Sequence, residues 1–143
     1  MSNRLEDLQP DVREKAVALI EAASAAGMPI RITHTLRSLD EQAHLYAQGR
    51  TLPGAVVTKA RPGWSWHNFG RAFDICFAGK KPYPPKNDPR WLKVGQAGEA
   101  LGLNWGGPNG KGDRFTFDRP HFEDRGGQTL AQMRVAAGIE KLA

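Results

Sequence analysis

The sequence of 143 residues has a single cysteine and no long apolar run. One cysteine excludes an internal disulfide framework and a zinc knuckle built on cysteines, and we expect Cys76 to be a small buried side chain. A membrane-spanning helix needs about 20 consecutive apolar residues, so we expect no membrane span. Residues 1–7 lack the apolar stretch of a secretory signal, and we therefore expect no conventional Sec export.

The chain also lacks a dense block of charge of one sign. Twenty Lys and Arg against fifteen Asp and Glu give a net charge of +5, and the pI of about 9.7 favours acidic surroundings. The basic residues are scattered, however, and no nucleic-acid-binding motif accompanies them. We therefore expect a basic, solvated surface and no nucleic-acid partner.

Apolar residues at helical or alternating spacing, together with capping residues, predict the secondary structure. Ser38 with Glu41, and Thr129 with Gln132, form capping boxes at two helix starts. We expect loops over 50–64 and 106–113. The expected helices cover 10–26, 39–48, 89–101 and 129–141, and the expected strands cover 29–35 and 71–77.

These elements mix without regular βαβ alternation, which predicts an α+β fold. The length fits one domain over residues 1–143, because the sequence shows neither a linker nor a repeat.

Two histidines lie in segments rich in aromatic residues that also contain an aspartate. In the strand over 71–77, Asp74 lies opposite the core-facing side chains, and Gly70 permits a turn that brings His67 to the same face. With His121, these residues are a sufficient ligand set for a catalytic zinc. The same pattern also fits a packed histidine and a turn-capping aspartate, so the residues alone leave both interpretations open. His34 and His44 are expected to be ordinary residues.

Several motifs together resemble the zinc peptidases of family M15, the VanY and D-Ala-D-Ala carboxypeptidase superfamily. The two main motifs are Ser-x-His-x-x-Gly-x-Ala-x-Asp over 65–74 and Asp-x-Pro-His-Phe over 118–122. Further similarity lies in 37–58 and in Leu-x-Trp-Gly-Gly over 103–107, so the resemblance covers about residues 28–123. It implies a small, mainly antiparallel sheet flanked by helices, as in hedgehog and DD-peptidase folds, followed by a C-terminal helix over about 129–141.

Within this superfamily, the Asp-x-Pro-His-Phe ending resembles the L-alanyl-D-glutamate endopeptidases of phage endolysins. The resemblance implies a monomer that acts on bacterial peptidoglycan during host lysis. Such a protein is made in the host cytoplasm and reaches the wall in the periplasm after holin-dependent release. The basic surface would add weak attraction to anionic wall components.

The resemblance also implies roles for individual residues, each requiring a particular side-chain chemistry. It implies that Zn²⁺ is bound by His67, Asp74 and His121. It also implies that Asp118 is the general base and that Arg37 holds the substrate carbonyl or oxyanion. Ser65 and Gln42 would contact substrate or support the ligands. Pro120 argues against a helix that would place Asp118 and His121 on one face. The segment 108–114 also departs from the family pattern, which has a further tryptophan there.

Three other functions stay open at this point. One is a zinc D,D- or L,D-carboxypeptidase of the same fold, although Asp118 in place of the glutamate of that branch favours the endopeptidase. Another is a non-catalytic wall-binding module with a structural metal, which would need neither Asp118 nor Arg37. A nucleic-acid binder has only the pI in its favour.

Overall fold

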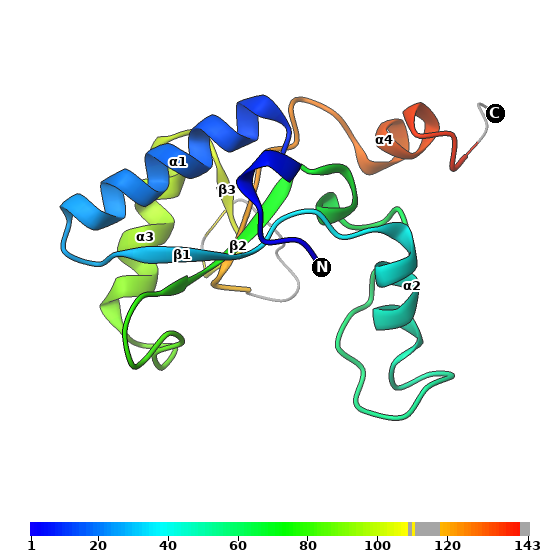
Figure 1. Ribbon diagram of the computed structural model, residues 1–143, viewed down its shortest axis with the longest axis horizontal. Coiled ribbons are helices and arrows are strands. Elements are labelled where there is room, and N and C mark those ends of the chain that lie inside the picture. The colour runs from blue at the N-terminus through cyan, green and yellow to red at the C-terminus, as the bar shows by residue number, and fades with distance from the viewer. Residues whose placement is uncertain (109, 111–117, 141–143) are drawn as a thin grey trace.

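The computed structural model describes residues 1–108, 110 and 118–140, and its elements follow the predicted mixture of helices and strands (Figure 1). Within these residues the helices are α1 Pro10–Ala25, α2 Leu39–Ala47, α3 Pro89–Ala100 and α4 Leu130–Ala136, with short 3-10 helices η1 Leu5–Asp7 and η2 Trp66–Phe69. The strands are β1 Ile30–His34, β2 Ala72–Phe77, β3 Asn104–Trp105 and β4 His121–Glu123. They form one antiparallel sheet in the order β1-β2-β4-β3, which confirms the α+β class.

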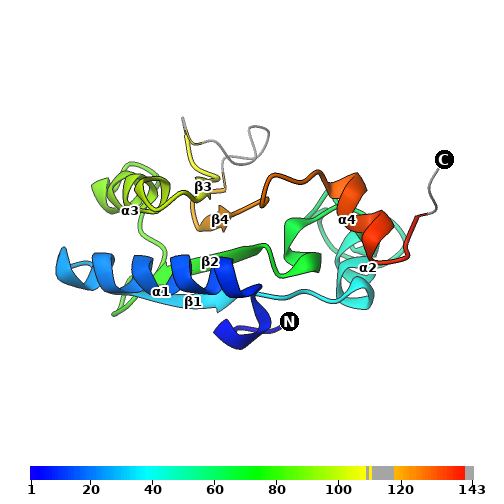
Figure 2. The same cartoon turned by 90° about the horizontal axis from the view of Figure 1, so that it is seen from above.

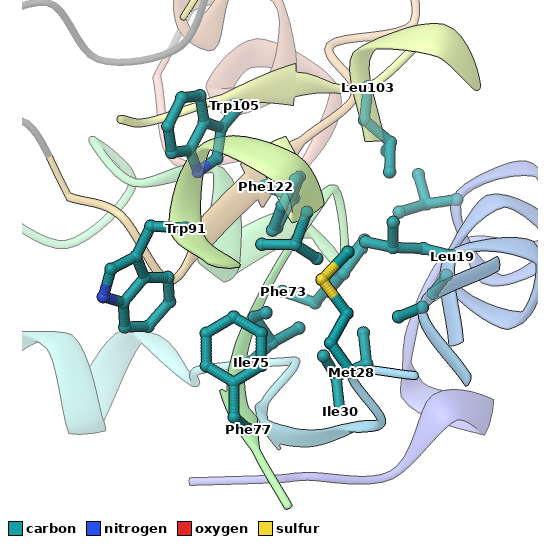
Figure 3. Close-up of a cluster of buried hydrophobic side chains, with 14 of the residues drawn as sticks. Leu19, Met28, Ile30, Phe73, Ile75, Phe77, Trp91, Leu103, Trp105 and Phe122 are labelled. Atoms are coloured by element: carbon teal, nitrogen blue, oxygen red, sulfur yellow. The ribbon is translucent and has the colours of Figure 1, made fainter. Parts of the chain in front are cut away.

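The main core lies between one face of the sheet and helices α1 and α3. Alternation along β2 places Phe73, Ile75 and Phe77 in this core, each at most 1% exposed, as the sequence pattern predicts. Figure 3 shows these side chains packed against α1 and α3. The rings of Phe73 and Phe122 are stacked, with 5.6 Å between their centroids. This packing fixes the positions of β2 and β4, the two central strands.

The opposite face of the same strands presents polar side chains. Asp74 on β2 pairs in register with His34 on β1 and with His121 on β4. Paired residues of adjacent strands point to the same side of a sheet, so these three side chains converge. Figures 1 and 2 show α2, η2 and α4 towards one end of the sheet, away from the bulk of α1 and α3.

The C-terminal helix is shorter than predicted. It ends at Ala136 because Gly138 adopts a left-handed conformation (φ 75°), and the amides of Gly138 and Ile139 bond to Val135 and Arg134. The prediction of a helix to residue 141 is therefore wrong at its end, and residue 141 itself lies outside the described residues. The other predicted helices and strands are confirmed to within one residue at each end.

The two predicted loops differ in what the structure describes. Residues 50–64 contain no helix or strand beyond an isolated bridge between Gln48 and Leu52, as expected. Part of the 106–113 loop, and of the departing segment 108–114, lies outside the described residues. Cys76 is buried and free, in line with the prediction. Within the described ranges, no helix has the length and apolar character to cross a membrane.

Candidate functional site

A capped 3-10 turn delivers His67 to the polar face of the sheet. The Ser65 hydroxyl accepts a hydrogen bond from the His67 amide, and the Asn68 side chain accepts one from the Ser65 amide. Gly70 then closes the turn in the left-handed region (φ 67°), where a β-carbon would be strained. The Ser65 and Gly70 positions of the first motif thus explain how His67 returns over Asp74.

His121 is delivered by a strand and not by a helix. The amide of His121 donates to the backbone oxygen of Asp118 (3.1 Å), and its carbonyl accepts from Gly106 (2.9 Å). A β-carbon at Gly106 would lie 2.6 Å from the Asp118 oxygen, so only glycine permits this approach. The indole of Trp105 donates to the Arg119 carbonyl (2.7 Å). The Trp-Gly-Gly motif therefore holds the segment that carries Asp118 and His121.

The side chains of His67, Asp74 and His121 have the spacing of a zinc ligand set. Asp74 Oδ1 lies 3.2 Å from His67 Nε2 and 3.1 Å from His121 Nδ1. Ligand atoms about 2.0–2.1 Å from a tetrahedral zinc are about 3.3 Å apart, close to both distances. One ligand atom from each residue lies within 4.8 Å of the others. Two imidazoles and one carboxylate leave a fourth position open, the arrangement of catalytic zinc sites.

Hydrogen bonds set the electrostatics of this cluster against the effect of burial. Burial alone would raise the pKa of Asp74, but hydrogen bonds from His121, His34 and His67 hold it well below its ordinary value. Burial likewise opposes the charged form of His121. Its hydrogen bonds with Asp74 and Glu123 outweigh that effect and raise its pKa to about 10. Without metal, the imidazole of His121 is therefore protonated at neutral pH.

This protonation predicts opposite pH dependences for metal binding and for the stability of the metal-free protein. Binding at Nδ1 must displace a proton from His121, so we expect metal affinity to rise with pH and one proton to leave near neutral pH. The pKa of His121 in the folded protein, about 10, exceeds its ordinary value of 6.5. Protonated His121 therefore stabilises the metal-free folded protein below pH 6.5, and this stabilisation is lost as the pH rises towards 10.

Calorimetric titration with zinc in buffers of different ionisation enthalpy measures the proton release. Urea unfolding of the metal-free protein at several pH values measures the stability. Zinc uptake near neutral pH without proton release would contradict this protonation of His121.

Arg37 lies beside the cluster in a buried polar network. Its Nη1 donates to Gln42 Oε1 (2.9 Å), and its carbonyl accepts from Asn68 Nδ2 (3.1 Å). Burial lowers the pKa of Arg37, an effect that the nearby charges of Asp74, Glu41 and Asp118 oppose. Within the described residues, Arg37 Nε is buried without a hydrogen-bond partner. An unsatisfied buried donor costs about 1–3 kcal/mol. Arg37 also lines the groove described below.

The predicted substrate residues occupy different environments. Gln42 is fully buried, and its amide is bonded to Arg37, Asn68 and the Ala60 carbonyl (2.7 Å). This placement favours support of Arg37 over direct contact with substrate. Ser65 caps η2 and also lines the open cavity described next.

A large groove opens over the candidate ligands. Its volume is about 1480 Å³, above the usual range of about 300–1,000 Å³ for a small-ligand pocket. Its lining includes residues from 57–67 and from 118–125, among them His67 and His121, together with Arg37 and Asp74. Asp118 is exposed at the groove, and Trp64, 52% exposed, also lines it.

Sequence reasoning missed several residues around the ligands. His34, expected to be ordinary, places Nδ1 3.3 Å from Asp74 Oδ2, because β1 pairs with β2 at this position. Glu123 lies two residues beyond His121, a spacing that places both on one face of a strand. No sequence signal identifies the Thr35 carbonyl, which lies 2.8 Å from His67 Nδ1. His44, by contrast, is exposed on α2.

Comparison with protein families and characterised sequences shows that the chain is similar to peptidoglycan peptidases. Residues 5–100 match the family described as VanY, D-alanyl-D-alanine carboxypeptidase. The peptidoglycan L-alanyl-D-glutamate endopeptidase CwlK of Bacillus subtilis (strain 168) is 40% identical over 126 residues. That alignment covers 82% of this chain and 73% of CwlK.

Solved structures with the same fold come from two kinds of peptidase. The L-Ala D-Glu endopeptidase ChiX of Serratia marcescens aligns with a TM-score of 0.55 and 18% identity, covering 90% of this chain and 86% of ChiX. The L,D-carboxypeptidase DacB of Streptococcus pneumoniae aligns with a TM-score of 0.62 and 23% identity, covering 94% of this chain and 74% of DacB. At these identities the structural likeness establishes the fold.

Proposed function

Since the chain belongs to the VanY D-alanyl-D-alanine carboxypeptidase family, we propose that it is a zinc-dependent peptidoglycan endopeptidase that hydrolyses the L-alanyl-D-glutamate bond of the stem peptide. The observation that carries the metal assignment is the spacing of His67, Asp74 and His121 around one point. The choice of bond rests on the 40% identity to CwlK over most of the chain.

The residues around that point have the chemistry that peptide hydrolysis needs. Bound zinc supplies a water of lowered pKa and a Lewis acid for the scissile carbonyl. Asp118, exposed at the groove, takes the proton of the attacking water and passes it to the leaving amine. Arg37, which lines the groove, stabilises the oxyanion through its guanidinium, an effect of about 3 kcal/mol for comparable donors.

The size of the groove supports a polymeric substrate. A terminal dipeptide would fill only part of about 1480 Å³, whereas a stem peptide attached to glycan extends beyond the scissile bond on both sides. The groove also bears Lys59, Lys86 and Arg119, which suit the carboxylates of the stem peptide. We further propose that the protein is the lysis enzyme of a phage, monomeric, and released to the periplasm through holin lesions.

The second candidate function is a zinc carboxypeptidase of the same fold, which the likeness to DacB favours. Mass spectrometry of products from digested Gram-negative peptidoglycan separates the two, with a sample treated with chelator as control. The endopeptidase releases peptides that begin with D-Glu and leaves L-Ala on the glycan. Release of D-Ala alone would establish the carboxypeptidase, and no cleavage by a zinc-loaded protein would favour the wall-binding module.

A further inference from the structure

Both candidate histidine ligands direct one ring nitrogen at Asp74 and the other at a protein acceptor. The acceptor for His67 Nδ1 is the backbone oxygen of Thr35, at 2.8 Å. The acceptor for His121 Nε2 is a carboxylate, Glu123 Oε1, at 2.9 Å. A ring nitrogen that carries hydrogen cannot bind a metal, so an acceptor on the far side keeps the near nitrogen available.

We propose that Glu123 is a positioning residue of the metal centre, which holds His121 with its proton on Nε2 and strengthens Nδ1 as a ligand. This inference rests on the proposed zinc-dependent function. It assigns a role to a residue outside the family motifs, because the Asp-x-Pro-His-Phe motif ends at residue 122.

The surroundings of Glu123 are those of a fixed acceptor. Its side chain is 3% exposed, and β4 places it on the same sheet face as His121. Oε2 accepts from Arg125 Nε at 2.5 Å, so both carboxylate oxygens are engaged. Arg125 in turn lies over the Trp66 ring, 5.7 Å from its centroid. Because a buried carboxylate is costly unless it is paired, these contacts explain how an ionised group is retained beside His121.

The two histidines therefore differ in the charge of the group behind them. A neutral carbonyl orients His67, whereas an anion orients His121 and raises the electron density of its ring. Loss of the Glu123 carboxylate would weaken the His121 ligand while leaving the Thr35 contact of His67 intact. This difference separates a positioning role from a general loss of folding.

The experiment measures zinc affinity of the full chain by competition with a chromophoric chelator. We expect Glu123→Leu to lower zinc affinity by about 10–100-fold, the usual cost of losing such a partner. Glu123→Gln retains a neutral acceptor and should lower affinity less. Asp124→Asn is the matched control, because Asp124 is a neighbouring, mostly buried carboxylate that bonds Lys15 and Arg71 instead of a candidate ligand.

The visible absorption of the cobalt-loaded protein gives a second readout that a merely structural ion pair would not move. We expect its bands to shift in both Glu123 variants and to stay unchanged in Asp124→Asn. Wild-type affinity and an unchanged cobalt spectrum in folded Glu123→Leu would overturn the inference. If circular dichroism shows that this variant does not fold, Glu123→Gln decides by the same two criteria. Failure of the unmodified protein to bind zinc would instead overturn the proposed function.

Discussion

Replacing His67 by alanine is expected to remove stoichiometric zinc and to abolish peptidoglycan cleavage. His67 supplies Nε2 to the candidate ligand cluster from a position that is only 4% exposed. Removing a direct ligand should lower zinc affinity by more than the factor of about 10–100 that follows the loss of a ligand's hydrogen-bond partner. Metal analysis after dialysis, combined with release of soluble peptides from the wall, measures both results.

His121→Ala should also lose zinc, but it tests the site less cleanly. Removing this imidazole leaves Asp74 without one hydrogen bond and Glu123 with Arg125 alone, so two buried carboxylates lose compensation. We therefore expect His121→Ala to lower the free energy of unfolding of the metal-free protein more than His67→Ala does. His44→Ala is the control, since His44 is exposed on α2. One equivalent of tightly bound zinc in both ligand variants would defeat the assignment.

The sequence pattern predicts the central strand of this fold well. Alternation in 71–77 identifies both the core-facing side chains and the opposite position of Asp74, because strand geometry allows only two faces. The turn that returns His67 is also readable, since Gly70 and the Ser65 cap act locally. Local sequence patterns therefore suffice to predict the placement of two of the three candidate ligands.

The position of the third candidate ligand depends on contacts distant in the sequence. His121 reaches Asp74 only because β4 pairs with β2 and the Trp-Gly-Gly segment lies against residues 118–121. No local pattern in 118–123 encodes that pairing, so the resemblance to a family was needed to anticipate it. Pro120 correctly argues against a helix, and the observed strand agrees with that argument.

The hydrogen bonds that hold Arg37 are likewise not predictable from local sequence patterns. Asn68 bonds to Gln42 and to the Arg37 carbonyl across 26 and 31 residues of sequence, and neither contact follows from helix or strand periodicity. The helical pattern of 39–48 places Gln42 on α2, but it does not reveal that the side-chain amide of Gln42 is already hydrogen-bonded within this network. Side-chain hydrogen bonds between distant segments thus decide which polar residues remain free for a substrate.

Replacing Asp118 by asparagine is expected to leave zinc bound and to lower kcat by about 10²–10⁴, the usual contribution of general acid–base catalysis. The substitution keeps the size of the side chain but removes its ability to take a proton. It also keeps the backbone oxygen that accepts from the His121 amide, so the ligand segment should hold its position. Asp118 lies outside the ligand cluster yet lines the same groove, which is the placement a proton acceptor requires.

The matched control is Asp40→Asn, which removes the same charge from an exposed position on α2. Metal analysis and the rate of release of wall peptides are measured for both variants. Because we propose that the Asp118 side chain transfers protons and does not bind metal, we expect normal zinc content with slow turnover. Near-wild-type turnover would remove Asp118 as the base, and loss of zinc in Asp118→Asn would instead make it part of the metal centre.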